Sequence, residues 1–148
     1  MMRYRDSGEV HKDFHGTLNT TVDYVVKHYG EDALREIFAK VGKDVYRSIH
    51  EKLKNGDASE LIEHIRYYFD REGAVYNLEA GPDEIVLEVL ECPAVKQVRA
   101  LGLTLSPYFC RQTIDVNAAM CDGTPWRTST EILGCGHCRQ VFRKEVEA

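Results

Sequence analysis

The hydrophobic positions in the first half of the chain recur every three or four residues, which is the period of amphipathic helices. The pattern predicts a first helix from Thr17 to Gly30, because glycine commonly stops a helix. A long apolar stripe in residues 31–56 predicts a second helix; its members are Leu34, Ile37, Phe38, Val41, Val45, Ile49 and Leu53. Gly42 interrupts this stripe and predicts a kink or a close helix contact. A third helix is expected over residues 61–69.

The period changes to two after the third helix, as expected for half-buried antiparallel strands. Residues 74–79 and 84–92 predict two strands joined by a turn at residues 80–83. After a helical segment, residues 124–133 and 138–146 predict a second hairpin.

Two further helices are expected between the hairpins. Pro93 suits the first turn of a short helix that runs to about Leu101. Ser106-Pro107 resembles an N-cap followed by proline and predicts a helix that runs to about Cys121.

The order of elements predicts the fold class. Helices and strands are segregated along the chain, which favours an α+β fold with helices packed on a four-stranded antiparallel sheet made of two hairpins. We expect residues 1–16 to form a polar N-terminal arm and residues 17–148 to form a single α+β domain.

Charge and composition restrict the partners. The 148 residues carry a net charge of −5, and the basic residues are scattered along the chain. Nucleic acid is therefore not an expected partner. The apolar runs are too short for a membrane span, and the N-terminus is too polar for a signal peptide, so we expect a cytoplasmic protein without membrane contact.

Five cysteines form an odd set, which favours free thiols or metal ligands over a disulfide framework. Cys135 and Cys138 form one Cys-x-x-Cys pair, whereas a structural zinc site usually has two such pairs. The residues after Cys138 alternate like a strand, which disfavours a thioredoxin-like dithiol at a helix start. The surviving local interpretation is a glycine-rich hairpin turn that delivers a thiol into a site.

Four short patterns, taken together, suggest a family. They are Cys92-Pro93, Phe109-Cys110, Arg127-Thr128-Ser129-Thr130, and Gly134 with Cys138. This array resembles the L-2-amino-thiazoline-4-carboxylic acid hydrolase-like family, although Cys135 replaces an acidic residue usual there. The element order also resembles the 4-vinyl reductase domain and the related vesicle-tethering subunits. That likeness implies helices on one face of a twisted sheet and a homodimer, which we expect to form through the N-terminal helices.

The hydrolase resemblance implies that the substrate is a small cyclic amidine or thiazoline that carries a carboxylate. Opening such a ring needs a nucleophile and a proton donor. We expect Cys110 to be the nucleophile, with Cys92 or Cys138 close by. Asp115 or His137 would move the proton.

The substrate contacts are expected from four further residues. Arg127 would bind the carboxylate, because its planar guanidinium binds carboxylates through two hydrogen bonds. Thr130 on the same strand, His15 at the entry to the first helix and Tyr108 complete the expected binding residues.

Other interpretations stay open from the sequence. Any one of the cysteines can simply fill the core, and His15 can cap a helix. A non-catalytic small-molecule-binding module would need only an apolar pocket. A zinc-dependent sensor would use Cys110, Cys135, His137 and Cys138, and no other cofactor is expected.

Overall fold

A computed structural model describes residues 13–146, which form six helices and four strands. In chain order these elements are α1 (Asp13–Tyr29), α2 (Glu31–Asp44), α3 (Arg47–Lys54), α4 (Ser59–Glu72), β1 (Val75–Ala80), β2 (Glu84–Glu91), α5 (Pro93–Ala100), α6 (Arg111–Cys121), β3 (Trp126–Gly134) and β4 (His137–Lys144). None of the helices in this described part has the length and apolar character needed to cross a membrane.

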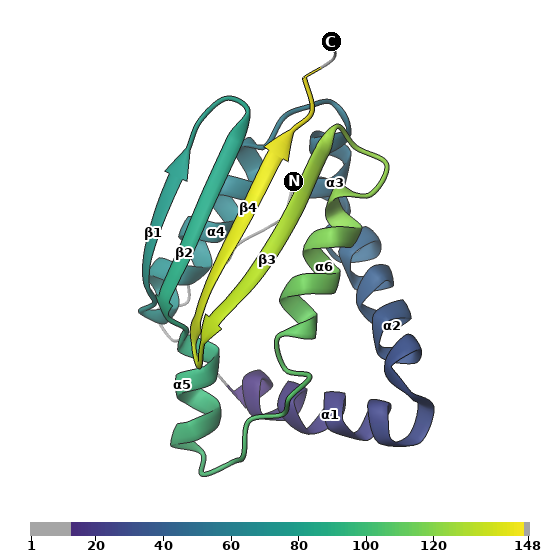
Figure 1. Ribbon diagram of the computed structural model, residues 1–148, viewed down its shortest axis with the longest axis vertical. Coiled ribbons are helices and arrows are strands. Elements are labelled where there is room, and N and C mark those ends of the chain that lie inside the picture. Colours follow the sequence, from purple (N-terminus) through teal and green to yellow (C-terminus); the bar gives the residue numbers. More distant parts are fainter. Residues whose placement is uncertain (1–12, 147–148) are drawn as a thin grey trace.

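The four strands form one antiparallel sheet in the order β1-β2-β4-β3. Each hairpin supplies two neighbouring strands, and the β2–β4 pairing joins the hairpins. Helices α4 and α6 lie behind the sheet, whereas α5 and α1 lie at the end where β3 turns into β4 (Figure 1). The expected α+β fold, with a four-stranded antiparallel sheet made of two hairpins, is confirmed.

One face of the sheet and the helices behind it form the core. Alternate strand residues project to opposite faces, so Ile85, Leu87 and Val89 of β2 share the covered face. Trp126 of β3 and Phe142 of β4 lie on this face as well, and each is 1% exposed. Burial of this apolar face holds the two hairpins against the helices.

The long helix expected over residues 31–56 is divided into α2 and α3, so this prediction was wrong. The backbone N–H groups of Val45 and Tyr46 both donate to the carbonyl oxygen of Val41, at 3.0 and 3.3 Å. Tyr46 leaves the helical conformation at this point, with φ −98° and ψ 27°. The Tyr46 side chain packs against the core, and this packing accounts for the break between α2 and α3.

Gly42 marks a close contact with α6, while the break in the helix comes three residues later. A Cβ atom on Gly42 would lie 2.6 Å from the Cβ of Ala119 and 2.9 Å from the carbonyl oxygen of Val116. Real Cβ atoms are essentially never that close to another heavy atom, so α2 and α6 approach each other only because this residue is glycine.

We therefore expect the Gly42→Ala variant to be less stable by about 2 kcal/mol, because overpacking against α6 outweighs the gain of about 1 kcal/mol in helix propensity. Urea unfolding would measure the change. The control is Glu36→Ala at an exposed position of α2, which should change stability by less than about 0.5 kcal/mol. A Gly42→Ala variant more stable than the parent chain would contradict the close packing.

The boundaries of two other helices also differ from expectation. Helix α6 begins at Arg111, not at Ser106-Pro107, because Ser106 is held by α1. The backbone N–H of Ser106 donates to Asn19 Oδ1 at 2.8 Å, and its hydroxyl donates to Asp23. Helix α1 begins at Asp13, so residues 13–16 of the expected arm are helical, while residues 1–12 lie outside the described part.

Candidate functional site

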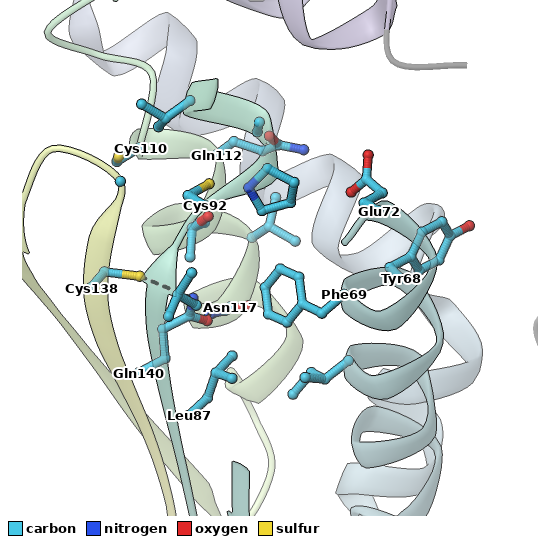
Figure 2. A pocket seen from close by; sticks show the side chains of 18 of the residues that line it. Tyr68, Phe69, Glu72, Leu87, Cys92, Cys110, Gln112, Asn117, Cys138 and Gln140 are labelled. Carbon is cyan, nitrogen blue, oxygen red and sulfur yellow. Dashed lines mark hydrogen bonds between the residues drawn. The ribbon is translucent and has the colours of Figure 1, made fainter. Parts of the chain in front are cut away.

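A cavity of about 430 Å³ lies between α4, α6 and the covered face of the sheet. The first residues of α1 and α5 and the tip of the β3–β4 hairpin contribute to one end of its lining. Figure 2 shows side chains of α4 facing those of β4 and of the segment that leads to α6 across this space. The site therefore collects residues from most of the fold.

The walls of the cavity are mainly apolar, because helical and strand periodicity place hydrophobic residues there. Helix α4 contributes Leu61, Ile65 and Phe69 at spacings of four residues. Helix α6 contributes Val116 and Met120 at the same spacing. A cavity with this lining can hold an organic molecule with a large apolar surface.

Three of the expected catalytic cysteines meet at this cavity. Cys92 precedes α5, Cys110 precedes α6 and Cys138 lies on β4, and all three contribute to the lining (Figure 2). All three are free thiols and partly buried. The fold thus brings together residues that are up to 46 positions apart in the sequence.

Burial determines the protonation of these thiols. It raises the pKa of Cys110 to about 11, with smaller contributions from the thiols of Cys92, Cys138 and Cys135. Burial also raises the pKa of Cys92 and of Cys138. The three sulfur atoms at the cavity are therefore neutral thiols at pH 7, and none is a preformed thiolate nucleophile.

An amide pair on the cavity wall was not anticipated from the sequence. Asn117 Nδ2 donates to Gln140 Oε1 at 2.8 Å, and Gln140 Nε2 donates to Cys138 Sγ at 3.5 Å. Both amides are more than 90% buried. Gln140 occupies an inward position on β4, between Cys138 and Phe142. A polar residue at such a position is the one signal in the sequence that indicates a buried hydrogen-bond partner.

A second polar pair joins the start of α1 to the end of α4. His15 Nε2 lies 2.7 Å from Glu72 Oε1, and both side chains are less than 10% exposed. His15 was an expected binding residue and does contribute to the lining. Glu72 was missed, because a glutamate at the end of an amphipathic helix carries no local sign that a distant histidine will cover it.

His64 of α4 is another member of the lining that was missed. Its ring lies 5.2 Å from the ring of Tyr46 and 4.8 Å from that of Tyr68, both in edge-on arrangements. Burial lowers the pKa of His64 to about 4, although Glu60 acts in the opposite direction. This histidine is therefore neutral at pH 7.

The two residues expected to move protons have other contacts. Asp115 accepts two hydrogen bonds from Arg111, at 2.7 and 3.2 Å, and does not contribute to the lining. His137 contributes to the edge of the lining, but its Nε2 lies 3.0 Å from Glu88 Oε1. Because neighbouring strand residues point to opposite faces, the His137 ring projects away from the face that carries Cys138.

Three of the four expected binding residues lie outside the lining. Arg127 is exposed, donates to the carbonyl oxygen of Thr124 at 2.7 Å and lies 3.0 Å from Glu145. Thr130 pairs with Gln140 across the β3–β4 ladder. Tyr108 is half-buried against the core. The structure therefore does not bring Arg127 to the thiols as a carboxylate-binding group.

The charges at the cavity are few. Among the described residues that line it there is no lysine or arginine, and Glu72, which pairs with His15, is the only carboxylate. Within residues 13–146, no group of three or more histidine, cysteine, aspartate or glutamate side chains is placed to hold a metal ion.

The resemblances to the hydrolase family and to the 4-vinyl reductase domain stay predictions from the sequence. Comparison of the chain with protein-family models, with curated proteins and with solved structures found no match.

Proposed function

We propose that this protein binds a small, uncharged and mainly apolar molecule in the cavity between α4, α6 and the sheet. The observation that carries the proposal is the cavity of about 430 Å³, whose apolar walls surround a few fixed polar groups. Sites for small organic ligands have this combination, in which apolar area contributes affinity and a few polar groups set the orientation.

The electrostatics of the lining favour an uncharged ligand. An anion would lose its hydration without meeting a lysine or arginine among the described lining residues. A cation would meet only Glu72, which already pairs with His15. His64 and the three thiols are neutral at pH 7 and add no charge.

The amide pair supplies the polar recognition. Asn117 uses its Nδ2 to bind Gln140, whereas its Oδ1 accepts no hydrogen bond from the described residues. A ligand with an N–H or O–H group near the middle of an apolar skeleton could donate to this oxygen.

A neutral fluorescent probe tests the proposal. N-phenyl-1-naphthylamine is expected to bind with increased fluorescence, because its two aromatic groups would be removed from water. Thr113→Trp, which places an indole at the lining, should weaken this binding by about tenfold or more. The matched control is Ala118→Trp on the exposed side of α6, which should bind the probe like the parent chain. Equal binding by both variants would place the probe elsewhere and contradict the proposal.

Hydrolysis of a thiazoline carboxylate is the second candidate, and the meeting of Cys92, Cys110 and Cys138 at one cavity favours it. The reaction would need a thiol to lose its proton as substrate binds, because burial keeps the pKa of Cys110 near 11. Incubation with 2-amino-2-thiazoline-4-carboxylate separates the two candidates. Formation of the ring-opened product, lost in Cys110→Ser, would support hydrolysis, and unchanged compound would support binding alone.

A further inference from the structure

We propose that Cys135 and Cys92 form a thiol–disulfide exchange site. In this site the exposed Cys135 reacts with a low-molecular-weight disulfide, and Cys92 then resolves the adduct into a Cys92–Cys135 disulfide. The site lies where the tip of the β3–β4 hairpin meets the start of α5, and it does not depend on the ligand-binding proposal.

Backbone contacts place the two cysteines next to each other. The N–H of Cys92 donates to the carbonyl oxygen of Gly136 at 2.9 Å. In the β2–β4 ladder Val89 pairs with Cys138, so continuing the register beyond its last pair brings Cys92 opposite the Cys135-Gly136 turn. Cys92 and Cys135 are not themselves a ladder pair, but Cys135 directly precedes Gly136, so the two cysteines lie in adjacent segments. A disulfide between them requires Cα atoms about 4.4–6.8 Å apart.

Cys135 is the thiol that a reagent in solution reaches first. Of the five cysteines it is the only one with an exposed side chain; Cys92, Cys110 and Cys138 are partly buried and Cys121 is buried. Arg99, in the last turn of α5, places its Nη2 2.8 Å from Cys135 Sγ. An exposed sulfur beside a guanidinium is the environment typical of reactive cysteines.

Cys92 is suited to the resolving step. Burial raises the pKa of its thiol, while the backbone amides of Val95 and Ala94 at the start of α5 act in the opposite direction. A buried thiol reacts slowly with bulky reagents in solution but readily with a disulfide formed beside it, because the local concentration of the partner is high.

The exchange is balanced in atoms and electrons. The Cys135 thiolate attacks one sulfur of a disulfide R–S–S–R, so that a mixed disulfide forms and one RS⁻ leaves and is protonated. Cys92 then loses its proton to solvent and attacks the Cys135 sulfur, which releases the second RS⁻. Two protein thiols are oxidised by two electrons, and R–S–S–R is reduced to two R–SH.

The test uses glutathione disulfide as the reagent, followed by acid quenching, alkylation and mass spectrometry of the unreduced digest. The parent chain is expected to yield peptides joined through Cys92 and Cys135. Cys135 and Cys138 share the tryptic peptide of residues 128–139, so fragment ions must identify the linked cysteine.

The variants separate the two roles. Cys92→Ser should accumulate a glutathione adduct on Cys135. Cys135→Ser should react with glutathione disulfide at least about tenfold more slowly than the parent chain. Cys121→Ser, in which a buried cysteine elsewhere is changed, should behave like the parent chain. A disulfide from Cys92 to Cys110 or Cys138, or a stable adduct on Cys135 in the parent chain, would overturn the proposal. Both of these results are read from the parent chain and do not depend on the folding of a variant.

Discussion

Replacement of Phe142 by alanine is expected to lower the free energy of unfolding by about 3–5 kcal/mol, the range found when a buried phenylalanine is truncated. Phe142 is 1% exposed and lies on β4, between β2 and β3. Its neighbours across the two ladders are Ile85 and Thr128. Removing the ring takes apolar contacts from the centre of the sheet, where the surrounding strands cannot collapse to refill the space.

The next residue along β4 provides the control for this prediction. Val141 points to the opposite face and is half-buried, so Val141→Ala should lower the free energy of unfolding by only about 1 kcal/mol. Chemical denaturation of both variants, monitored by circular dichroism, measures the difference. Equal losses for the two variants would mean that the inward and outward faces of β4 are assigned wrongly.

Acid is expected to destabilise the folded protein between pH 6.5 and 4 through His64. Its pKa is about 4 in the folded chain and about 6.5 when unfolded, so the unfolded state binds a proton that the folded state excludes. The stability that neutral His64 provides is complete above pH 6.5 and is lost as the pH falls toward 4. The linkage relation converts this difference into a loss of about 3 kcal/mol near pH 4.

The slope of stability against pH tests this expectation. His64→Phe keeps an aromatic ring beside Tyr46 and Tyr68 but cannot take up a proton, so its stability should fall less between pH 6.5 and 4.5 than that of the parent chain. His28→Gln changes an exposed histidine of α1 and should leave the slope unaltered. If His64→Phe showed the same slope of stability against pH as the parent chain, His64 would be excluded as the cause of the destabilisation by acid.

The carboxylates with lowered pKa act in a different pH range. Asp44, Asp57 and Asp122 have pKa values lowered by Lys40, Ser59 and Lys43 respectively. Their contributions are present above the ordinary pKa near 4 and are lost at lower pH. Measurements that stop at pH 4.5 therefore exclude most of the stability loss from these three aspartates.

The polar residues expected at the site were predicted only in part from the sequence. The expectation that Cys92 or Cys138 lies close to Cys110 drew on motif positions, and the structure brings all three cysteines to one cavity. The motif that contains Arg127 gave no such guidance, since that side chain binds Thr124 and Glu145 instead.

Local pattern determined the α+β class and the four strands, because alternation and helical period depend only on residues close in the chain. The break at Tyr46 escaped this reasoning, since it follows from packing against the core and not from a helix-stopping residue.

The pairing of His15 with Glu72 and of Asn117 with Gln140 joins residues 57 and 23 positions apart. Such contacts depend on how α1, α4 and α6 are placed over the sheet, and that placement is a property of the whole packed core. The sequence by itself therefore determined the kinds of element and their order along the chain. Only the tertiary structure decided which polar groups meet across the cavity and which are held elsewhere.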